Sequence, residues 1–499
     1  MTEHSELIAQ RRSKLTKLRE ENKTAYPNTF QPSSTAAALH AAYPTQTREE
    51  LAEQSPVYKL AGRVMNIRAF GKLTFIKLVD DTGHIQLSAS LDVMGEEAFK
   101  ALDTMLDLGD IIGVEGKMTR TNKGELTLQI EKAHMLAKCL QPLPDKWHGL
   151  ENIEQRYRQR YVDLLMNPEV KDVFVKRSKM IRAIREYLDN SGFLEVETPI
   201  LQVLAGGTIA RPFDTHHNAL DMPLKLRIAP ELFLKRLLVG GFTQVYELSR
   251  NFRNEGVSTK HNPEFTMLEW YSAYGTRESM MEIMEGLLRH AAEKTLGTLQ
   301  VPYGEDEIVD LAPPFTRLTM KDAVVKYTDT TAAELESMEG LTTAALRNGL
   351  KADKIEGLGY GELLQTLFEH KVEEQLIQPT FITEYPMATS PLTREDPENP
   401  GWTQRSELYI IGREHGELYS ELNDPDDQRK RLEDQRAKAA AGDAEAMPFD
   451  EDFLNALEIG MPPAGGVGLG IDRLAMFLTN QPSIRDVLLF PLQKPKPQE

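Results

Sequence analysis

Residues 244–273 alternate between apolar and polar side chains on both sides of a short loop, a pattern typical of two paired β-strands. Before the loop, Tyr246 and Leu248 fall on one face of the strand and Glu247 on the other. The loop, at 256–263, contains glycine, serine and an Asn-Pro pair, which favour turns. We therefore expect an antiparallel hairpin at this point of the chain.

One face of this hairpin carries charged and aromatic side chains. Arg253 precedes the loop. After the loop, Phe265, Glu269 and Tyr271 are spaced four and then two residues apart, so they share one face of the strand. A single arginine or glutamate is more often a surface ion-pair partner than part of a site. Several of them on one face are costly to bury unless they bind something polar. The hairpin therefore predicts one wall of a binding site.

The length of 499 residues predicts two or three domains. Residues 58–140 contain five short strands with a helix after the third, the pattern of an OB-fold β-barrel. We expect a helical extension at 1–57, a proline-containing linker at 141–155 and a larger domain at 156–499. Strands interrupted by helices and hairpins indicate that this domain is α+β, on an antiparallel sheet flanked by helices, with a helical insertion around 320–378.

Two further segments of the larger domain have distinct patterns. Residues 193–201 are predicted to be one strand with Pro199 at an edge. Residues 464–478 are predicted to be a glycine-rich strand that runs into a helix. The glycines match a dinucleotide-binding fingerprint only weakly, because no βαβ unit or ribose-binding acid follows, and close packing of the backbone is the better interpretation.

The composition of the chain indicates in which compartment the protein acts and which partners are excluded. The formal charge of −18 argues against a protein that coats nucleic acid, DNA included, although a local basic groove remains compatible with it. The single cysteine, Cys139, cannot form an intrachain disulfide and suits a reducing compartment. No signal peptide and no apolar run of ~20 residues is present. We expect a cytoplasmic protein that does not enter a membrane.

The predicted barrel has candidate nucleic-acid contacts. OB-folds bind single strands by stacking bases on exposed aromatic rings beside basic and amide side chains. Arg68, Phe75 and Gln86 lie on the first three strands or their connections and could serve in this way. Phe75 could equally belong to the barrel core, and the pattern leaves both interpretations open.

Three features of the larger domain suggest a nucleotide. Arg253 and Arg473 offer paired donors suited to phosphate. Glu414 and Glu421 lie on a strand-like segment and could share a magnesium ion. Phe265, with Arg473 opposite, could hold a flat ring by stacking and cation–π contact. Together they predict a nucleoside triphosphate bound without a P-loop.

Several motifs, in their order along the chain, resemble those of the bacterial class II lysyl-tRNA synthetases over nearly the whole length. Residues 192–199 resemble motif 1, which forms the dimer, and residues 468–473 resemble motif 3. Motif 2 is matched by 250–255 together with 261–265. Similarity to the lysine subgroup is found at 107–116, 229–232, 266–271 and 420–424.

The resemblance implies a reaction and its partners. Lysine and ATP condense to lysyl-adenylate with release of pyrophosphate, and the lysyl group then passes to the 3′ end of tRNA(Lys). It also implies a homodimer and Mg2+ as cofactor. Arg253 would hold the α-phosphate and the lysine carboxylate, and Arg473 would meet the γ-phosphate, as the two catalytic residues.

The resemblance also implies residue sets for each ligand. The residues implied for ATP are Arg253, Glu255, His261, Phe265, Glu414 and Arg473. Those implied for lysine are Gly207, Glu231, Arg253, Glu269, Tyr271, Tyr419 and Glu421. The implied magnesium ligands are Glu414 and Glu421, and the implied anticodon contacts are Arg68, Phe75 and Gln86.

One position departs from the family pattern. Glu417 stands where the family usually has asparagine, and Leu418 where it usually has glycine. By alternation Glu417 shares a face with Tyr419 and Glu421, where it would repel the substrate carboxylate or ATP unless a cation bridges them. Leu418 is expected to point the other way.

Three alternatives to a housekeeping lysyl-tRNA synthetase follow. The first alternative, suggested by Glu417, is a paralogue that is specific for a lysine analogue. A relative that lysylates a protein instead of tRNA is disfavoured by the barrel, which such relatives lack. A non-catalytic tRNA-binding regulatory protein is disfavoured by a shared set of charged residues, namely Arg253, Glu414, Glu421 and Arg473.

Overall fold

The computed structural model describes the chain except for residues 1–2, 21–25, 145–149, 443–445 and 496–499. The chain forms two compact units, residues 1–149 and residues 150–499. Residues 145–149 of the predicted linker lie outside the described residues. In the part of the chain that is described, no helix is both long and apolar enough to cross a membrane.

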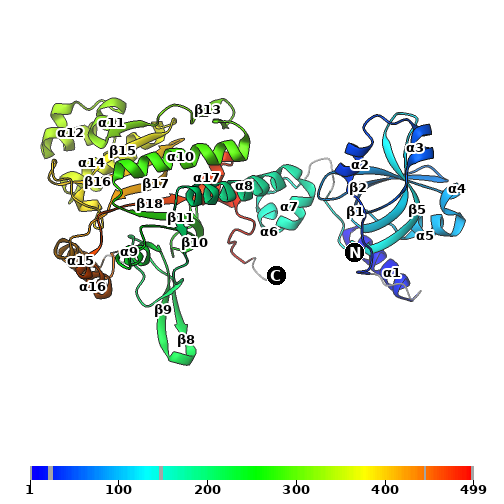
Figure 1. Cartoon of the computed structure of the whole chain (residues 1–499), viewed down its shortest axis with the longest axis horizontal. Helices are drawn as coiled ribbons and strands as arrows, with labels where there is room; N and C mark the ends of the chain where they lie inside the picture. Colours follow the sequence, from blue (N-terminus) through cyan, green and yellow to red (C-terminus); the bar gives the residue numbers. More distant parts are fainter. Residues whose placement is uncertain (1–2, 21–25, 145–149, 443–445, 496–499) are drawn as a thin grey trace. The chain divides into compact units, whose positions relative to one another are not determined.

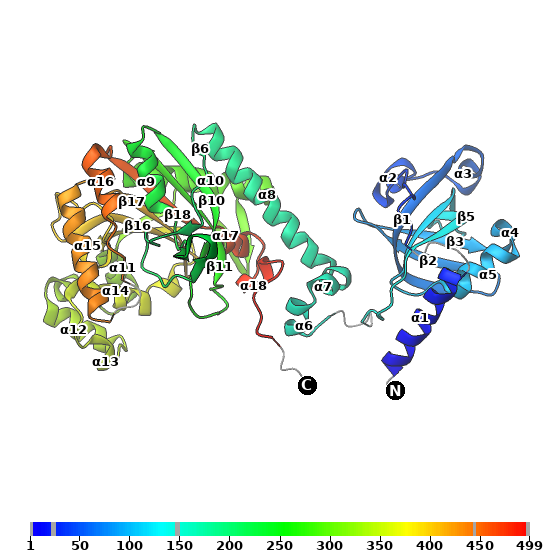
Figure 2. The ribbon, with the colours of Figure 1, turned by 90° about the horizontal axis from the view of Figure 1, so that it is seen from below.

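The first unit is built on a closed five-stranded barrel, which Figure 2 shows in blue and cyan. The strand order is β1-β2-β3-β5-β4, and two short helices follow the third strand, as expected of an OB-fold. The predicted fold class of this unit is confirmed. Its elements are β1 (Val57–Ala69), β2 (Leu73–Val79), β3 (His84–Ser90), α4 (Leu91–Met94), α5 (Glu96–Met105), β4 (Ile111–Arg120) and β5 (Leu126–Ala137).

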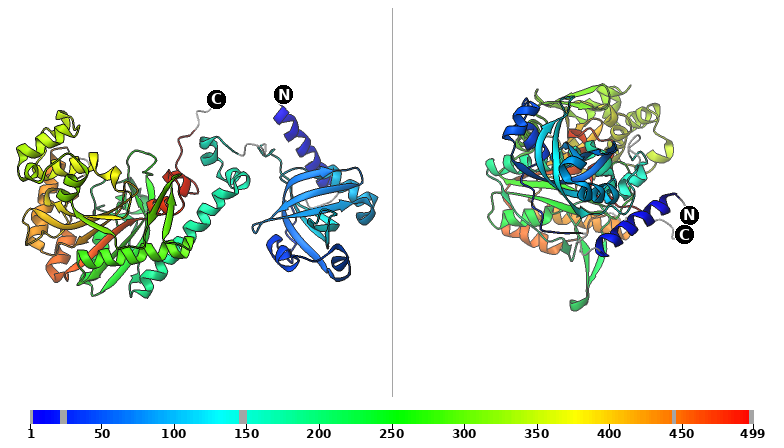
Figure 3. Two further views of the ribbon diagram at one scale, coloured as in Figure 1. Left: turned by 90° about the horizontal axis from the view of Figure 1, so that it is seen from above. Right: turned by 90° about the vertical axis from the view of Figure 1, so that its right-hand side faces the viewer.

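The helices of the first 57 residues pack against this barrel. Leu39 of α2 (Ala36–Ala42) and Leu51 of α3 (Arg48–Gln54) are part of the barrel's apolar core. The N-terminal half of α1 (Glu3–Glu20) projects from the barrel (Figures 2 and 3). Because buried leucines of α2 and α3 complete the core, these helices are a structural part of the barrel unit.

The second unit is organised around an eight-stranded sheet of order β14-β15-β16-β17-β18-β11-β10-β6 (Figure 1). Neighbouring strands are antiparallel except at the two edges, where β14 pairs with β15 and β6 with β10 in parallel. The predicted α+β fold is confirmed. The strands are β6 (Leu194–Glu195), β10 (Gln244–Phe252), β11 (Glu264–Ala273), β14 (Thr316–Thr319), β15 (Thr380–Pro386), β16 (Trp402–Ile410), β17 (Arg413–Ser420) and β18 (Ala464–Gly470).

One face of the sheet is covered by two long helices, α8 (Pro168–Asn190) and α10 (Arg277–Leu296), which lie side by side (Figure 1). Tyr246, Trp270 and Leu418 are fully buried in the apolar core between the sheet and these helices. Leu418 therefore points away from Glu417, as alternation predicts. The opposite face of the sheet carries the charged side chains of the hairpin.

The remaining elements surround this sheet. The helices of 320–378 share a second apolar core with Ile382 and Tyr385 of β15 and Tyr409 of β16. Strands β8 and β9 extend away from the sheet as a hairpin (Figure 1). These elements are α6 (Ile153–Arg158), α7 (Arg160–Met166), β7 (Leu201–Gln202), β8 (Asp214–His217), β9 (Met222–Leu226), α9 (Glu231–Val239), β12 (Gln300–Tyr303), β13 (Glu307–Asp310), α11 (Met320–Tyr327), α12 (Met338–Arg347), α13 (Ala352–Ile355), α14 (Tyr360–Lys371), α15 (Pro425–Ala440), α16 (Glu451–Gly460), α17 (Ile471–Leu478) and α18 (Ile484–Val487).

The prediction of a single strand over 193–201 is wrong. The segment is divided into β6, which pairs with β10, and β7, which pairs with β9 of a separate three-stranded sheet. Pro199 lies between them and has no N–H to donate to a ladder. The chain leaves one sheet there and joins the other.

Candidate active site

The centre of the site is a set of glycines in β18. Gly466 pairs with Tyr271 on one side and with Tyr419 on the other, and Gly468 pairs with Glu269 and Glu417. A Cβ on Gly466 would lie 2.0 Å from Glu421 Oε1, so a side chain does not fit there without a shift. Because these glycines have no side chains, the side chains of the neighbouring strands form the floor of the site.

Arg253 follows the end of β10, where its N–H donates to the carbonyl of Pro263 across the loop (2.9 Å). Its guanidinium lies 5.0 Å from the centre of the Phe265 ring. Burial lowers the pKa of Arg253. The negative charges of Glu417, Glu255 and Glu414 oppose this shift. The Nε atom is buried and makes no hydrogen bond to any described residue. A buried guanidinium with an unused donor is suited to an anionic ligand.

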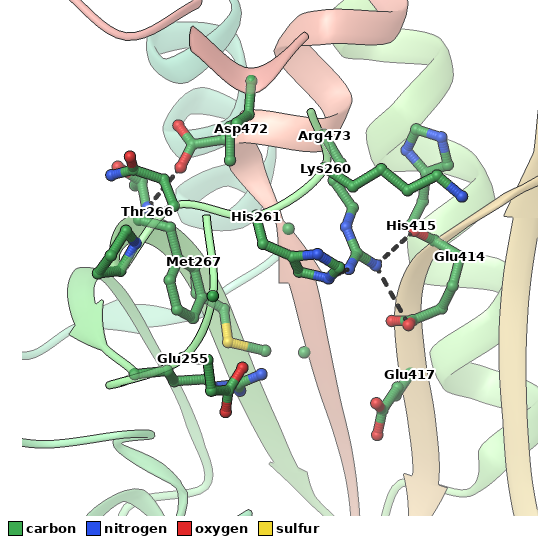
Figure 4. Close-up of a pocket in the computed structure, with 18 residues that line it drawn as sticks. Glu255, Lys260, His261, Thr266, Met267, Glu414, His415, Glu417, Asp472 and Arg473 are labelled. Atoms are coloured by element: carbon green, nitrogen blue, oxygen red, sulfur yellow. Dashed lines mark hydrogen bonds and ion pairs between the residues drawn. The ribbon is translucent and has the colours of Figure 1, made fainter. Parts of the chain in front are cut away.

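Arg473, in α17, lies across the same hollow (Figure 4). Its Nη1 donates to the Glu414 carbonyl (2.8 Å) and lies 3.2 Å from the Glu414 carboxylate. Its Nη2 lies 3.5 Å from His261 Nε2. Burial and the charge of Arg473 both lower the pKa of His261, so the imidazole is neutral at pH 7.

The hollow encloses about 800 Å3 of empty space, part of it open to solvent. It brings together all the residues predicted to bind ATP. The cation over the Phe265 ring is Arg253, while Arg473 is engaged with Glu414. The predicted ATP residues on its lining are Arg253, Glu255, His261, Phe265, Glu414 and Arg473.

A second hollow of about 840 Å3 adjoins the first and contains a group of carboxylates. Glu414 and Glu417 line both hollows, and Glu407 lines the second. Arg405 forms an ion pair with Glu407 and lies 3.5 Å from Glu417. Burial raises the pKa of Glu417 to about 7; Arg405 opposes this rise, and Glu414 adds to it.

The predicted magnesium pair of Glu414 and Glu421 stays a prediction. Glu414 lines both hollows, and Glu421 forms an ion pair with Lys235. The other carboxylates near Glu414 are Glu407 and Glu417, both of which it influences electrostatically. Glu407 was missed, although it lies seven residues before Glu414 on the preceding strand. No group of three or more metal-ligating side chains occurs in the described ranges, so a cation here needs oxygens from a ligand as well.

Glu421 belongs to a separate cluster of buried acidic groups, called the acidic pocket below. Tyr271 donates its hydroxyl to Glu269 Oε2 (3.0 Å). Lys235 Nζ lies 2.6 Å from Glu231 Oε1 and 2.6 Å from Glu421 Oε2. Burial raises the pKa of Glu269 well above its usual range and that of Glu421 to about 7. Such carboxylates favour a cationic ligand.

The other residues predicted to bind lysine border this pocket. Gly207 has φ +96°, and a Cβ there would lie 3.0 Å from Glu231 Cβ, so its backbone lies against that glutamate. Tyr419 pairs with Gly466 at the sheet centre. Lys235 was missed by the sequence analysis, although its position four residues after Glu231 in a predicted helix was a signal.

The barrel has a groove that contains all three residues predicted to contact nucleic acid. Arg68 donates to Gln86 Oε1 (3.3 Å), and Gln86 in turn donates to Thr127. The Phe75 ring is half-buried and meets Phe70, which is 64% exposed, edge to face at 6.2 Å. Phe75 is therefore accessible at the groove and is not a core residue.

Comparisons with known proteins cover both units. The family described as tRNA synthetases class II (D, K and N) matches residues 152–494, and the OB-fold nucleic acid binding domain family matches 58–136. The lysine--tRNA ligase of Moorella thermoacetica is 51% identical over 492 residues, 99% of this chain and 98% of that protein. Those of Carboxydothermus hydrogenoformans and Pseudomonas aeruginosa are each 50% identical, over 99% of this chain and 99% and 97% of those proteins.

Proposed function

Because the chain belongs to the class II lysyl-tRNA synthetases, we propose that it activates L-lysine with ATP on the 244–273 hairpin and transfers lysine to tRNA(Lys). The observation that carries the proposal is the arrangement of the site. An anion-binding hollow with two arginines lies on the same sheet as a cluster of buried carboxylates that suits ammonium groups. Together they accommodate both halves of lysyl-adenylate.

In the first step a lysine carboxylate oxygen attacks the α-phosphorus of ATP. A new P–O bond forms, and the bond to pyrophosphate breaks. Arg253 would neutralise the α-phosphate and the attacking carboxylate, while Arg473 would hold the γ-phosphate. Phe265 would stack on adenine, and Glu255 and His261 would seat the nucleotide. Positioning and charge neutralisation supply the catalysis, and no general base is needed.

The carboxylates of the second hollow fit a divalent cation. Burial raises the pKa of Glu407 and of Glu417, with Glu414 adding to both rises, and a cation would relieve this accumulation of negative charge. Glu414 and Glu421, the predicted ligands, would hold Mg2+ together with phosphate oxygens. When bound, the ion would neutralise the phosphates and the leaving pyrophosphate.

The acidic pocket would hold the two ammonium groups of lysine. Gly207 and Glu231 would take the α-ammonium group. Glu269, Tyr271 and Glu421 would take the ε-ammonium group, and Tyr419 would border the side chain. Burying these charges is favourable only because each ammonium meets a carboxylate.

We extend the proposal to tRNA, to the dimer and to the compartment. The barrel groove, with exposed aromatic rings beside Arg68, suits the splayed bases of an anticodon. A homodimer would cover the exposed apolar side chains near motif 1, such as Leu194 and Leu201. The cytoplasm is the proposed site of action, as expected for an enzyme of protein synthesis.

ATP–pyrophosphate exchange with a panel of amino acids tests the activity. We expect exchange that depends on lysine. Absence of exchange with every amino acid would contradict an enzyme. A preference for another amino acid would instead support the paralogue that Glu417 suggests, since this carboxylate lies near Arg253 at the nucleotide hollow.

Glu417→Asn should leave lysine-dependent exchange unchanged or improve it several-fold, on the order of 1 kcal/mol. The carboxylate repels anionic substrate groups when it is ionised. Since its pKa is about 7, Glu417 is mostly protonated below that pH and mostly charged above it. The gain should therefore be small near pH 6 and larger near pH 8, measured as kcat/KM for lysine and for ATP.

The matched control is Glu458→Asn, which removes a solvent-accessible glutamate paired with Arg429. It should leave exchange unchanged at every pH. A collapse of exchange in Glu417→Asn would show that Glu417 has been recruited into the site.

Phe75→Ala should weaken tRNA charging and spare pyrophosphate exchange. Loss of one base-stacking ring costs about 1–3 kcal/mol, which raises the KM for tRNA about 5- to 150-fold. The control is Tyr26→Ala, another exposed aromatic of the first unit that does not line the groove. Equal losses of charging and exchange in Phe75→Ala would contradict the anticodon assignment.

A further inference from the structure

A buried lysine in the amino-acid pocket has no role in the scheme above. The side chain of Lys235 is 0% exposed, and its ammonium touches both Glu231 and Glu421. Burial opposes the charged form, yet the two carboxylates raise the pKa of Lys235 above its usual value, so it stays charged. An internal ammonium therefore already contacts two of the groups that would bind the substrate.

The contacts of Lys235 leave one oxygen of each carboxylate available. Lys235 meets Glu231 Oε1, whereas the other oxygen, Oε2, lies on the side of Gly207. It meets Glu421 Oε2, whereas Oε1 faces Gly466 and Tyr271. That Oε1 is buried and accepts no hydrogen bond from the described parts of the chain. A buried acceptor without a donor indicates a place for a ligand N–H group.

The charges of the pocket can be balanced against a substrate. Glu231, Glu269 and Glu421 provide three carboxylates, and Lys235 provides one opposing charge. A diamino acid adds two ammonium groups, which leaves no charge uncompensated, while its own carboxylate meets Arg253. An amino acid with one ammonium would leave a buried carboxylate unpaired, which is costly.

We infer that Lys235 is a positioning residue, which fixes Glu231 and Glu421 and sets the pocket charge to accept amino acids with two ammonium groups. The inference rests on the proposed lysine activation and deepens it. Lysine-dependent exchange by the unaltered enzyme tests that activity separately, so a failure of either can be recognised.

The test is Lys235→Met in the full chain, measured by pyrophosphate exchange. The KM for lysine should rise at least about tenfold, since Glu231 and Glu421 lose their shared partner. The KM for ATP should change less than about twofold.

The chain provides a matched control in its other unit. Lys138 also has a fully buried side chain and bridges two carboxylates, Asp107 and Asp110, at 2.6 Å each. Lys138→Met removes a comparable buried charge from the unit that carries no proposed lysine contact. It should reduce thermal stability without changing the KM for lysine.

Two outcomes would overturn the inference. One is an unchanged KM for lysine in folded Lys235→Met. The other is an equal rise of the KM for ATP and of the KM for lysine, which indicates a structural role alone. If the methionine variant does not fold, Lys235→Gln is measured in the same way.

Discussion

Arg253→Ala should lower lysine-dependent ATP–pyrophosphate exchange by about 100- to 1,000-fold, chiefly in kcat. This guanidinium is buried over the Phe265 ring with an unused donor, at the junction of the nucleotide hollow and the carboxylate group. It would contact the α-phosphate and the attacking carboxylate together, and the charge on both changes in the transition state. Interactions that strengthen there act on the chemical step.

The control for Arg253→Ala lies three residues earlier on the same hairpin. Arg250 is 46% exposed in its side chain and makes only a long ion pair with Glu264 at 3.7 Å. Arg250→Ala should change exchange less than about twofold. Arg253→Lys should retain part of the activity, because an ammonium keeps the charge but loses the paired donors. A mild effect of Arg253→Ala would contradict the assignment of this hollow to adenylation.

The hairpin at 244–273 could be predicted from the sequence because the faces of a strand follow from a period of two. Glu247 pairs with Glu269, and Phe265 lies with Arg253 as alternation requires. The same rule separated Glu417 from the buried Leu418. Within one pair of hydrogen-bonded strands, the alternation of the sequence is enough to tell which side chains lie on the same face.

Which residues of different strands lie close together could not be predicted in this way. Glu407 was overlooked because the cross-strand register, which sets it opposite Glu417, cannot be derived from one segment of sequence. The break at Pro199 similarly depends on a second sheet that no local pattern reveals. Lys235 was missed because its second partner, Glu421, is far away in sequence.

Gly466→Ala should raise the KM for lysine by at least about 100-fold and leave the KM for ATP nearly unchanged. The added Cβ would lie 2.0 Å from Glu421 Oε1 and 2.4 Å from Tyr271 Cε1. Glu421 cannot move aside easily, because its other oxygen is held by Lys235 at 2.6 Å, and the Tyr271 ring is buried. The methyl group would therefore displace the groups proposed to hold the ε-ammonium. Amino-acid-dependent and ATP-dependent exchange kinetics measure the two effects separately.

Gly468→Ala is the matched control, two residues along the same strand and on the same face. Its Cβ would meet only the end of a flexible side chain, Met267 Cε at 2.6 Å, which can rotate away. Met267 lines the nucleotide hollow, so any effect should fall on the KM for ATP and spare that for lysine. If both glycine variants raised the two KM values alike, the lysine pocket would not be separate from the nucleotide hollow. An effect of the first methyl group on the KM for lysine and of the second on the KM for ATP would place the boundary between the two substrates between Gly466 and Gly468.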